Sequence, residues 1–100
     1  MHSFGDVVLS KIQFSDTFEV KRRPVLVLFK EHGNIVVAGI TSNLDMKGIK
    51  LTKKEGAMKE SIIKLNYIFT ISEEMVEKFL FKVPKGKKES IKRELFNKFE

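Results

Sequence analysis

One arginine and two hydroxyl side chains stand at the ends of consecutive apolar segments. Arg23 comes just before the apolar run 25–29, and Thr41 and Ser42 follow the apolar run 35–40. If the two runs pair as a hairpin, the guanidinium and the hydroxyls lie at the same end of the sheet. A guanidinium binds phosphate oxygens with two parallel hydrogen bonds, and hydroxyl donors beside it stabilise charge on the phosphate. The pattern therefore favours a phosphate-binding site.

Each of these side chains also has an ordinary structural interpretation. Surface arginines are common, so Arg23 alone could be a solvent-facing residue at the start of a strand. Thr41 and Ser42 alone could be hydroxyl residues that cap a strand end in a turn. The residue types by themselves leave a phosphate site and an ordinary sheet edge both open.

The composition excludes several kinds of site. The chain of 100 residues has no cysteine, which excludes disulfides and thiolate metal ligands. Its two histidines lie far apart in the sequence, so we expect no metal site and no cofactor. The net charge of +6 favours a polyanionic partner, either nucleic acid or an acidic protein.

The sequence gives no sign of export or of membrane insertion. Its first residues lack the basic and apolar regions of a signal peptide. The longest apolar run, 25–29, is far too short to span a bilayer. We therefore expect a soluble, cytoplasmic protein.

Apolar patterns and turn residues predict a series of strands. The hairpin is the clearest of them, because Gly33 and Asn34 supply the positive φ angles of a tight turn. Polar residues at 13–22 predict a loop long enough to carry function. In the segment 61–71 the alternation shifts near Tyr67, which indicates a bend or bulge. The predicted strands are 7–12, 25–29, 35–40, 49–52 and 61–71.

The last third of the chain predicts helices. Ser72 fits a helix N-cap, and apolar residues at helical spacing follow it to about Phe81. A second helix is predicted over 88–99, with an apolar face made of Ile91, Leu95, Phe96 and Phe99. The order of elements predicts one mainly β domain over residues 1–100. We expect a small sheet or barrel of about five to seven strands, closed by C-terminal helices.

Four motifs occur in an order that resembles the MazF/PemK-like toxins of type II toxin–antitoxin systems. They are GDVVL at 5–9, KRRPVLVL at 21–28, AGITS at 38–42 and SIIKLN at 61–66, the last followed by FTI at 69–71. The resemblance covers nearly the whole chain. It implies an SH3-like barrel, a homodimer and a metal-independent endoribonuclease that cuts single-stranded RNA (mRNA) at short specific sequences. It also implies an antitoxin whose acidic C-terminal segment lies across the RNA groove.

The same resemblance implies catalytic roles. Arg23 and Thr41 match active-site residues of the family, and Ser42 matches a neighbouring hydroxyl position. Cleavage without a metal uses the 2′-hydroxyl of RNA as nucleophile and leaves a 2′,3′-cyclic phosphate and a 5′-hydroxyl. We expect Arg23 to hold the phosphate and to stabilise its developing charge. The general base is not assigned, although Asp16 and Glu19 lie close to Arg23 in sequence.

RNA contacts are expected from the first loop and from a later strand. Unpaired bases stack on aromatic rings, and lysine and arginine contact phosphates. PemK-type members often carry Arg and Asp where this chain has Lys64 and Asn66. Lys64 keeps the positive charge but lacks the planar guanidinium that forms two parallel hydrogen bonds, and Asn66 lacks the carboxylate. The candidate RNA-binding residues are Phe14, Asp16, Phe18, Glu19, Lys21, Arg22, Lys64 and Asn66, and Lys47, Lys50, Lys53 and Lys54 are further candidates for phosphate contacts.

Two other functions stay open. A DNA gyrase inhibitor of the CcdB type shares the fold, but its activity is associated with a Trp-Gly-Ile ending, and this chain has no tryptophan and ends in Phe99 and Glu100. A barrel that binds RNA or a protein without cutting is the second alternative. It stays open because Lys64 and Asn66 depart from the family pattern.

Overall fold

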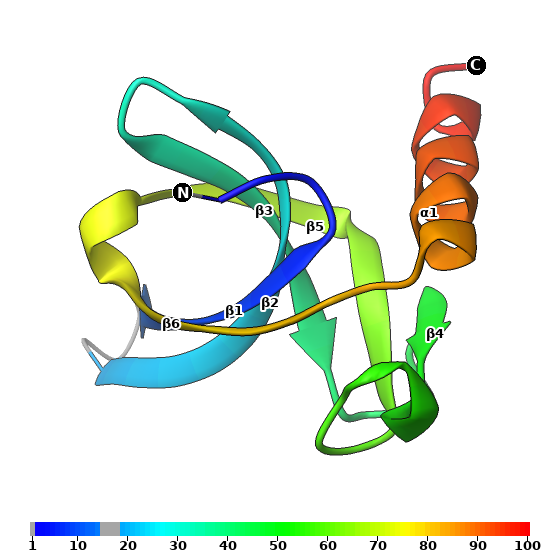
Figure 1. Cartoon of the computed structure of the whole chain (residues 1–100), viewed down its shortest axis with the longest axis horizontal. Coiled ribbons are helices and arrows are strands. Elements are labelled where there is room, and N and C mark those ends of the chain that lie inside the picture. The colour runs from blue at the N-terminus through cyan, green and yellow to red at the C-terminus, as the bar shows by residue number, and fades with distance from the viewer. Residues whose placement is uncertain (1, 15–18) are drawn as a thin grey trace.

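Strand pairing dominates the architecture. A computed structural model describes residues 2–14 and 19–100, with side chains at 2–12 and 19–100. Six strands form one antiparallel sheet in the order β4-β5-β3-β2-β1-β6, and the sheet curls strongly (Figure 1). The elements are β1 (Asp6–Phe14), β2 (Glu19–Glu31), β3 (Asn34–Thr41), β4 (Ile49–Leu51), η1 (Lys53–Glu55), β5 (Ser61–Ser72), η2 (Glu73–Met75), β6 (Val76–Lys82) and α1 (Lys85–Asn97).

The predicted hairpin of β2 and β3 is confirmed. Its turn lies one residue earlier than expected, because His32 and Gly33 carry the positive φ angles of 46° and 82°. Glu31 pairs directly with Asn34, so the connection has two residues, the length that fits the twist of the flanking strands. The predicted strands 7–12, 49–52 and 61–71 are also present, as β1, β4 and β5.

The predicted polar loop over 13–22 is wrong for most of its length. β1 continues to Phe14 and β2 begins at Glu19, with Phe14 opposite Glu19 and Gln13 opposite Val20. Strand pairing uses backbone groups, so an exposed hairpin can continue through polar side chains. In this hairpin Arg22 Nε donates to Glu77 Oε1 of β6 at 2.6 Å, which adds a contact that the local sequence does not reveal.

Alternate residues of the central strands fill two separate cores. Leu26 and Leu28 of β2 join one cluster, which reaches Ile91 of α1. Val25 and Val27 of the same strand join a second cluster on the other face. Because side chains alternate across a strand, a run that is apolar at every position is covered on both faces. The continuous apolar run 25–28 therefore identifies the centre of the sheet.

The predicted helix from Ser72 to about Phe81 is wrong. Ser72 does act as a cap, since its hydroxyl accepts from the backbone N–H of Glu74 at 3.3 Å, but only the 3₁₀ turn η2 follows. The chain then continues as β6, which pairs with the edge of β1. Val, Phe and Leu suit a strand as well as a helix, and an unpaired strand edge decides between them. Because β1 lies far away in sequence, local spacing did not show this edge.

The C-terminal helix is confirmed as a single helix, α1, which begins three residues before the predicted start. Ile91 is fully buried against the first cluster and Leu95 is partly buried. The predicted apolar face does not continue, because Phe96 and Phe99 are 74% and 84% exposed. No helix in the described part of the chain is both long and apolar enough to cross a membrane.

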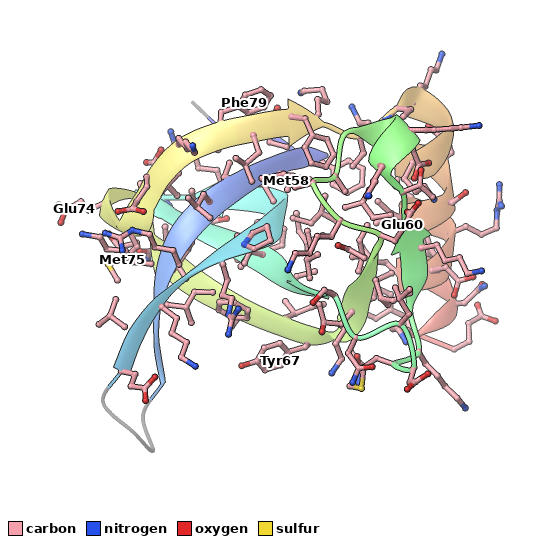
Figure 2. All side chains as sticks on the ribbon, turned by 90° about the horizontal axis from the view of Figure 1, so that it is seen from below. Met58, Glu60, Tyr67, Glu74, Met75 and Phe79 are labelled. Carbon is pink, nitrogen blue, oxygen red and sulfur yellow. The ribbon has the colours of Figure 1, made fainter. Side chains whose placement is uncertain are left out.

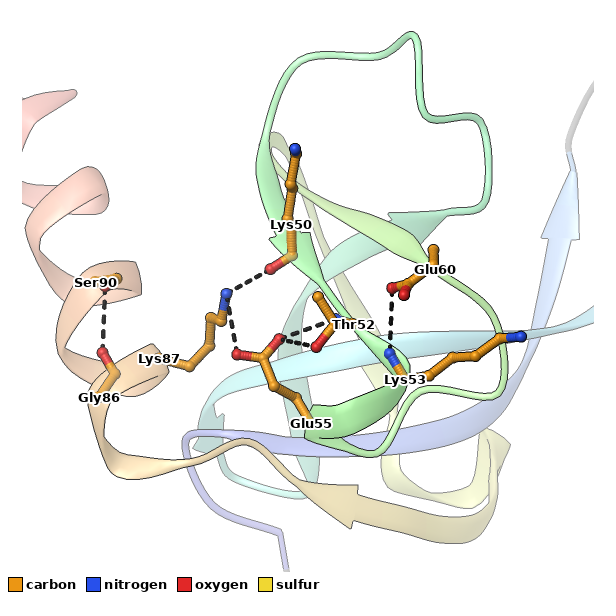
Figure 3. A network of polar contacts seen from close by, with 8 residues as sticks. All are labelled: Lys50, Thr52, Lys53, Glu55, Glu60, Gly86, Lys87 and Ser90. Carbon is orange, nitrogen blue, oxygen red and sulfur yellow. Dashed lines mark hydrogen bonds and ion pairs between the residues drawn. The ribbon is translucent and has the colours of Figure 1, made fainter.

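A polar network fastens α1 to the sheet (Figure 3). Lys87 Nζ lies 3.2 Å from a carboxylate oxygen of Glu55 and donates to the carbonyl of Lys50 at 2.6 Å. The other Glu55 oxygen accepts from the backbone N–H and the hydroxyl of Thr52, at 2.9 and 3.0 Å. Partial burial alone would raise the pKa of Glu55, but the Thr52 hydrogen bonds and Lys87 together hold the pKa below its ordinary value.

Replacing Glu55 by glutamine tests this network, because the amide keeps the shape and loses the charge. A lowered folded-state pKa stabilises the fold above the unfolded-state pKa of about 4.3 and loses that contribution as the pH falls through the folded-state value. We expect Glu55→Gln to reduce the free energy of unfolding by about 0.5–1 kcal/mol at pH 7 and by much less near pH 3. Urea denaturation at both pH values measures it. Glu89→Gln, at an exposed position of α1, is the control; a pH-independent deficit for Glu55→Gln contradicts the assignment.

Candidate functional site

A groove of about 250 Å³ opens beside the middle of β2, the end of β3 and the middle of β5. We call it the Arg23 groove. Its walls come from these three strands, from the end of β1 and from the turn after β3. The lining residues are Ile12, Arg23, Pro24, Val25, Gly39, Ile40, Thr41, Asn43, Met46, Lys64, Tyr67 and Phe69.

The hairpin register brings Arg23 and Thr41 into this groove. Val25 of β2 pairs with Gly39 of β3, and both line the groove. Arg23 and Thr41 each lie two residues further toward the open end of their own strands, so they share that face of the sheet. The two side chains are 18 residues apart in the chain, and the tight turn together with a one-residue register shift between Val27 and Phe29 sets them on one face.

The groove is cationic. Arg23 and Lys64 are the charged residues among its described lining, which includes no carboxylate. Among the described residues, neither side chain forms a hydrogen bond or an ion pair. Two like charges without a counter-ion in one concave site attract an anion and bind phosphate oxygens well.

The turn after β3 supplies neutral donors. Thr41 Oγ1 accepts from the backbone N–H of Asn43 at 3.1 Å, and Asn43 Oδ1 accepts from the backbone N–H of Asp45 at 3.1 Å. These bonds use the acceptor atoms to order the turn. The Thr41 hydroxyl proton and the Asn43 amide N–H groups are left as donors for a ligand in the groove. Asn43 was not predicted, since an asparagine in a polar loop gives no distinctive signal.

A bulge in β5 shapes the third wall. Ala38 pairs with Ile68 and the next residue, Gly39, pairs with Lys64, so residues 65–67 are extra on β5. The predicted irregularity near Tyr67 is thereby confirmed. The extra residues allow Lys64 and Tyr67, three positions apart, to line the same groove. Tyr67 is a second lining residue that the sequence did not single out.

Two of the predicted residues lie beside the groove and do not line it. Ser42 is exposed at the strand end and is not a lining residue. Asn66 lines a separate groove of about 550 Å³ between β5, the loop before β4 and the end of α1. Lys47 lines that second groove too, whereas Lys64 and Met46 line both. The second groove therefore continues the first one around β5.

The residues predicted at the start of β2 lie further out. Arg22 forms its ion pair with Glu77, while Lys21 lies 3.5 Å from Glu19 in an exposed pair. Phe14 has a described backbone in β1, and its side chain lies outside the description. Asp16 and Phe18 lie outside the described residues altogether. Their expected RNA contacts stay predictions.

A metal-binding group is not found within residues 2–14 and 19–100, where no three His, Cys, Asp or Glu side chains are placed to hold an ion. The described side chains of the Arg23 groove include two cations, a hydroxyl, an amide and an exposed aromatic ring. Such a set can bind a phosphodiester and stabilise negative charge on it.

Comparison with known proteins places the chain among toxins. The sequence profile of the PemK-like, MazF-like toxins of type II toxin–antitoxin systems matches residues 3–98. No curated protein matches the sequence. Two solved structures share the fold. Toxin MazF-mt6 of Mycobacterium tuberculosis superposes with a TM-score of 0.71 at 20% identity, over 92% of this chain and 95% of that one. A mycobacterial endoribonuclease in complex with its cognate antitoxin superposes with a TM-score of 0.72 at 11% identity, over 92% and 86%.

The Tyr67 ring packs directly against Gly39, and adding a methyl group at Gly39 tests this contact. A Cβ at Gly39 would stand 2.7 Å from Tyr67 Cδ2, so the ring must move. We expect Gly39→Ala to reduce the free energy of unfolding by about 1–3 kcal/mol. In a chain that already carries Tyr67→Ala, the same Gly39→Ala change should reduce the free energy of unfolding far less. A double-mutant cycle measured by urea denaturation tests this.

Gly86→Ala is the matched control, because nothing lies within 4 Å of a Cβ at that position of α1. It should leave the fold unchanged or stabilise it by about 0.5–1 kcal/mol. If Gly39→Ala reduces stability equally with and without the Tyr67 ring, the ring does not rest on this strand.

Proposed function

Because the chain belongs to the PemK-like, MazF-like toxins of type II toxin–antitoxin systems, we propose that it is an endoribonuclease that cuts single-stranded RNA. The observation that carries the proposal is the meeting of Arg23 and Thr41 in one cationic groove. The mycobacterial endoribonuclease with the same fold supports it. We propose that its substrate is mRNA, cut at short specific sequences in the cytoplasm.

The proposed reaction is a transesterification that consumes no water and uses no metal. The 2′-hydroxyl oxygen attacks the adjacent phosphorus, the bond from phosphorus to the 5′-oxygen breaks, and a 2′,3′-cyclic phosphate and a 5′-hydroxyl result. One proton leaves the 2′-oxygen and one is gained by the 5′-oxygen, so the protons balance. Negative charge is greatest on the non-bridging oxygens when five oxygens surround phosphorus, and fixed donors act best at that point.

The lining residues divide into roles on this basis. The Arg23 guanidinium binds two phosphate oxygens, and the Thr41 hydroxyl donates to one of them. Lys64 adds a second positive charge from β5. All three side chains act as hydrogen-bond donors, and the two cations also stabilise negative charge on the phosphate. None of the described lining residues is a carboxylate or an imidazole, so the general base is not assigned.

The proposed partners follow from charge and family. An antitoxin with an acidic segment would neutralise Arg23 and Lys64 and block access of RNA to the groove. The mycobacterial neighbour that was solved with its cognate antitoxin supports such a partner. We also propose a homodimer, in which two grooves serve one RNA-binding surface.

A barrel that binds RNA without cutting it is the second candidate. It is favoured by the absence of a carboxylate from the described part of the groove lining and by the positions of Ser42 and Asn66 outside that lining. Both candidates predict RNA binding, and only the first predicts new 5′-hydroxyl ends. The following experiment therefore separates them.

Replacing Arg23 by alanine tests the catalytic proposal. We expect the parent chain to cut a long single-stranded RNA in EDTA and the variant to cut on the order of a hundred- to a thousand-fold more slowly. Primer extension maps the ends, and a kinase that labels only 5′-hydroxyl termini identifies the product chemistry. Arg93→Ala, an exposed arginine of α1, should cut at the parental rate. Discrete cutting by Arg23→Ala at the parental rate would remove Arg23 from the mechanism, and binding without any cuts would favour the second candidate.

Salt dependence tests the phosphate contact of Lys64. A lysine that neutralises one phosphate of single-stranded RNA releases about 0.7 counterions, so Lys64→Gln should flatten the plot of log K against log salt by about that amount. The measurement uses fluorescence anisotropy with a 2′-O-methyl RNA, which lacks the attacking hydroxyl. Lys78→Gln, exposed on β6 and absent from both grooves, is the control and should keep the parental slope. Equal slopes for all three proteins would place the RNA elsewhere.

A further inference from the structure

Tyr67 is an exposed aromatic ring within a groove of cations. It lines the Arg23 groove, yet 52% of its surface is exposed. Figure 2 shows its side chain projecting from the molecule, on the side opposite to Phe79. A tyrosine ring has an apolar face that favours contact with another flat, apolar surface.

The ring is fixed in place by what lies beneath and beside it. Beneath it is Gly39, where even a methyl group would approach to 2.7 Å, so the ring packs directly on the β3 backbone. Beside it is Phe69, with ring centroids 5.2 Å apart and planes inclined by 46°. Phe69 in turn packs against the second core cluster. A ring that is already held loses little conformational entropy when a ligand stacks on it.

Positive charge borders the same ring. Lys64 Nζ lies 5.8 Å from the Tyr67 ring centroid, and the Arg23 guanidinium lines the same groove. One nucleotide combines a flat base with an anionic phosphate, and single-stranded RNA is bound by aromatic stacking next to basic groups. The bulge in β5 sets Lys64 and Tyr67 side by side and so matches this combination.

We propose that Tyr67, supported by Gly39 and Phe69, is a nucleobase-binding site beside the phosphate bound by Arg23 and Lys64. A base of the RNA stacks on the solvent-facing side of the Tyr67 ring and sets which phosphodiester bond reaches Arg23. The inference rests on the proposed function and adds to it the place where the substrate's base is held. It also assigns base contact to β5, whereas the sequence pointed to Phe14 and Phe18.

The chain provides its own probe for this site. Tyr67 is its only tyrosine, and it has no tryptophan, so tyrosine fluorescence reports on this ring alone. The ligands are a 2′-O-methyl RNA decamer and an abasic phosphodiester decamer of equal charge, and labelled copies measure binding by anisotropy. We expect the base-bearing decamer to quench at least half of the emission, after correction for absorbance, and the saturating abasic decamer to leave it nearly unchanged.

Variants give a second readout. Tyr67→Phe keeps the stacking face and should bind the decamer within about threefold of the parent, whereas Tyr67→Ala should raise Kd on the order of 5- to 100-fold. Abasic binding should be equal in all of them, which shows that the phosphate contacts are intact. Phe79→Ala is the control, because Phe79 is similarly exposed at 54% and does not line the groove.

The outcomes separate this inference from the proposed function. Parental RNA cutting that depends on Arg23, together with no base-dependent quenching, overturns the Tyr67 site alone. Equal quenching by the abasic decamer, or equal Kd values for Tyr67→Ala and the parent, overturns it as well. If the chain neither binds nor cuts RNA, both the site and the proposed function fail.

Discussion

The register of the β2–β3 hairpin is the constraint on which the site depends. A two-residue turn at His32 and Gly33 fixes the pairing next to the turn, and a one-residue shift between Val27 and Phe29 changes it along the hairpin. At the far end the shifted register, with Val25 opposite Gly39, sets Arg23 beside Thr41 in the groove. A slip of one residue would turn one of these side chains to the other face of the sheet. Burial of both faces of the central strands resists such a slip, because each face carries its own apolar cluster.

The second constraint is the bulge in β5. In a regular strand Lys64 and Tyr67 would point to opposite faces, since three positions separate them. The extra residues 65–67 let both line the Arg23 groove, and Gly39 on the facing strand leaves room for the aromatic ring. The groove thus has a cationic part made by Arg23 and Lys64 and an aromatic part made by Tyr67. An RNA nucleotide carries the matching groups, an anionic phosphate for the cationic part and a flat base for the aromatic part.

Local patterns in the sequence were sufficient for the hairpin, for the irregularity of β5 and for the C-terminal helix. The hairpin was enough to predict that Arg23 and Thr41 meet at one end of the sheet, because a turn converts distance in sequence into proximity. The one-residue shift between Val27 and Phe29, which sets their register, was not predicted, because it arises from pairing between the strands. The secondary structure of residues 72–81 could not be assigned from local sequence, since the spacing of their apolar residues fits a helix as well as a strand. Pairing with the edge of β1 makes residues 76–82 a strand. Tyr67 and Asn43 were missed as site residues for a related reason: the bulge and the turn that orient them arise from pairing between distant segments.

The central claim is that Arg23 and Thr41 act on the same phosphate, and a double-mutant cycle on RNA cleavage tests it most directly. The rates of Arg23→Ala, Thr41→Val and the double variant would be compared with the parent under single-turnover conditions in EDTA. Two donors to one transition state are strongly non-additive, so the double variant should be little slower than the slower single variant. Rate losses that multiply independently, or a Thr41→Val chain as active as the parent, would contradict a shared site.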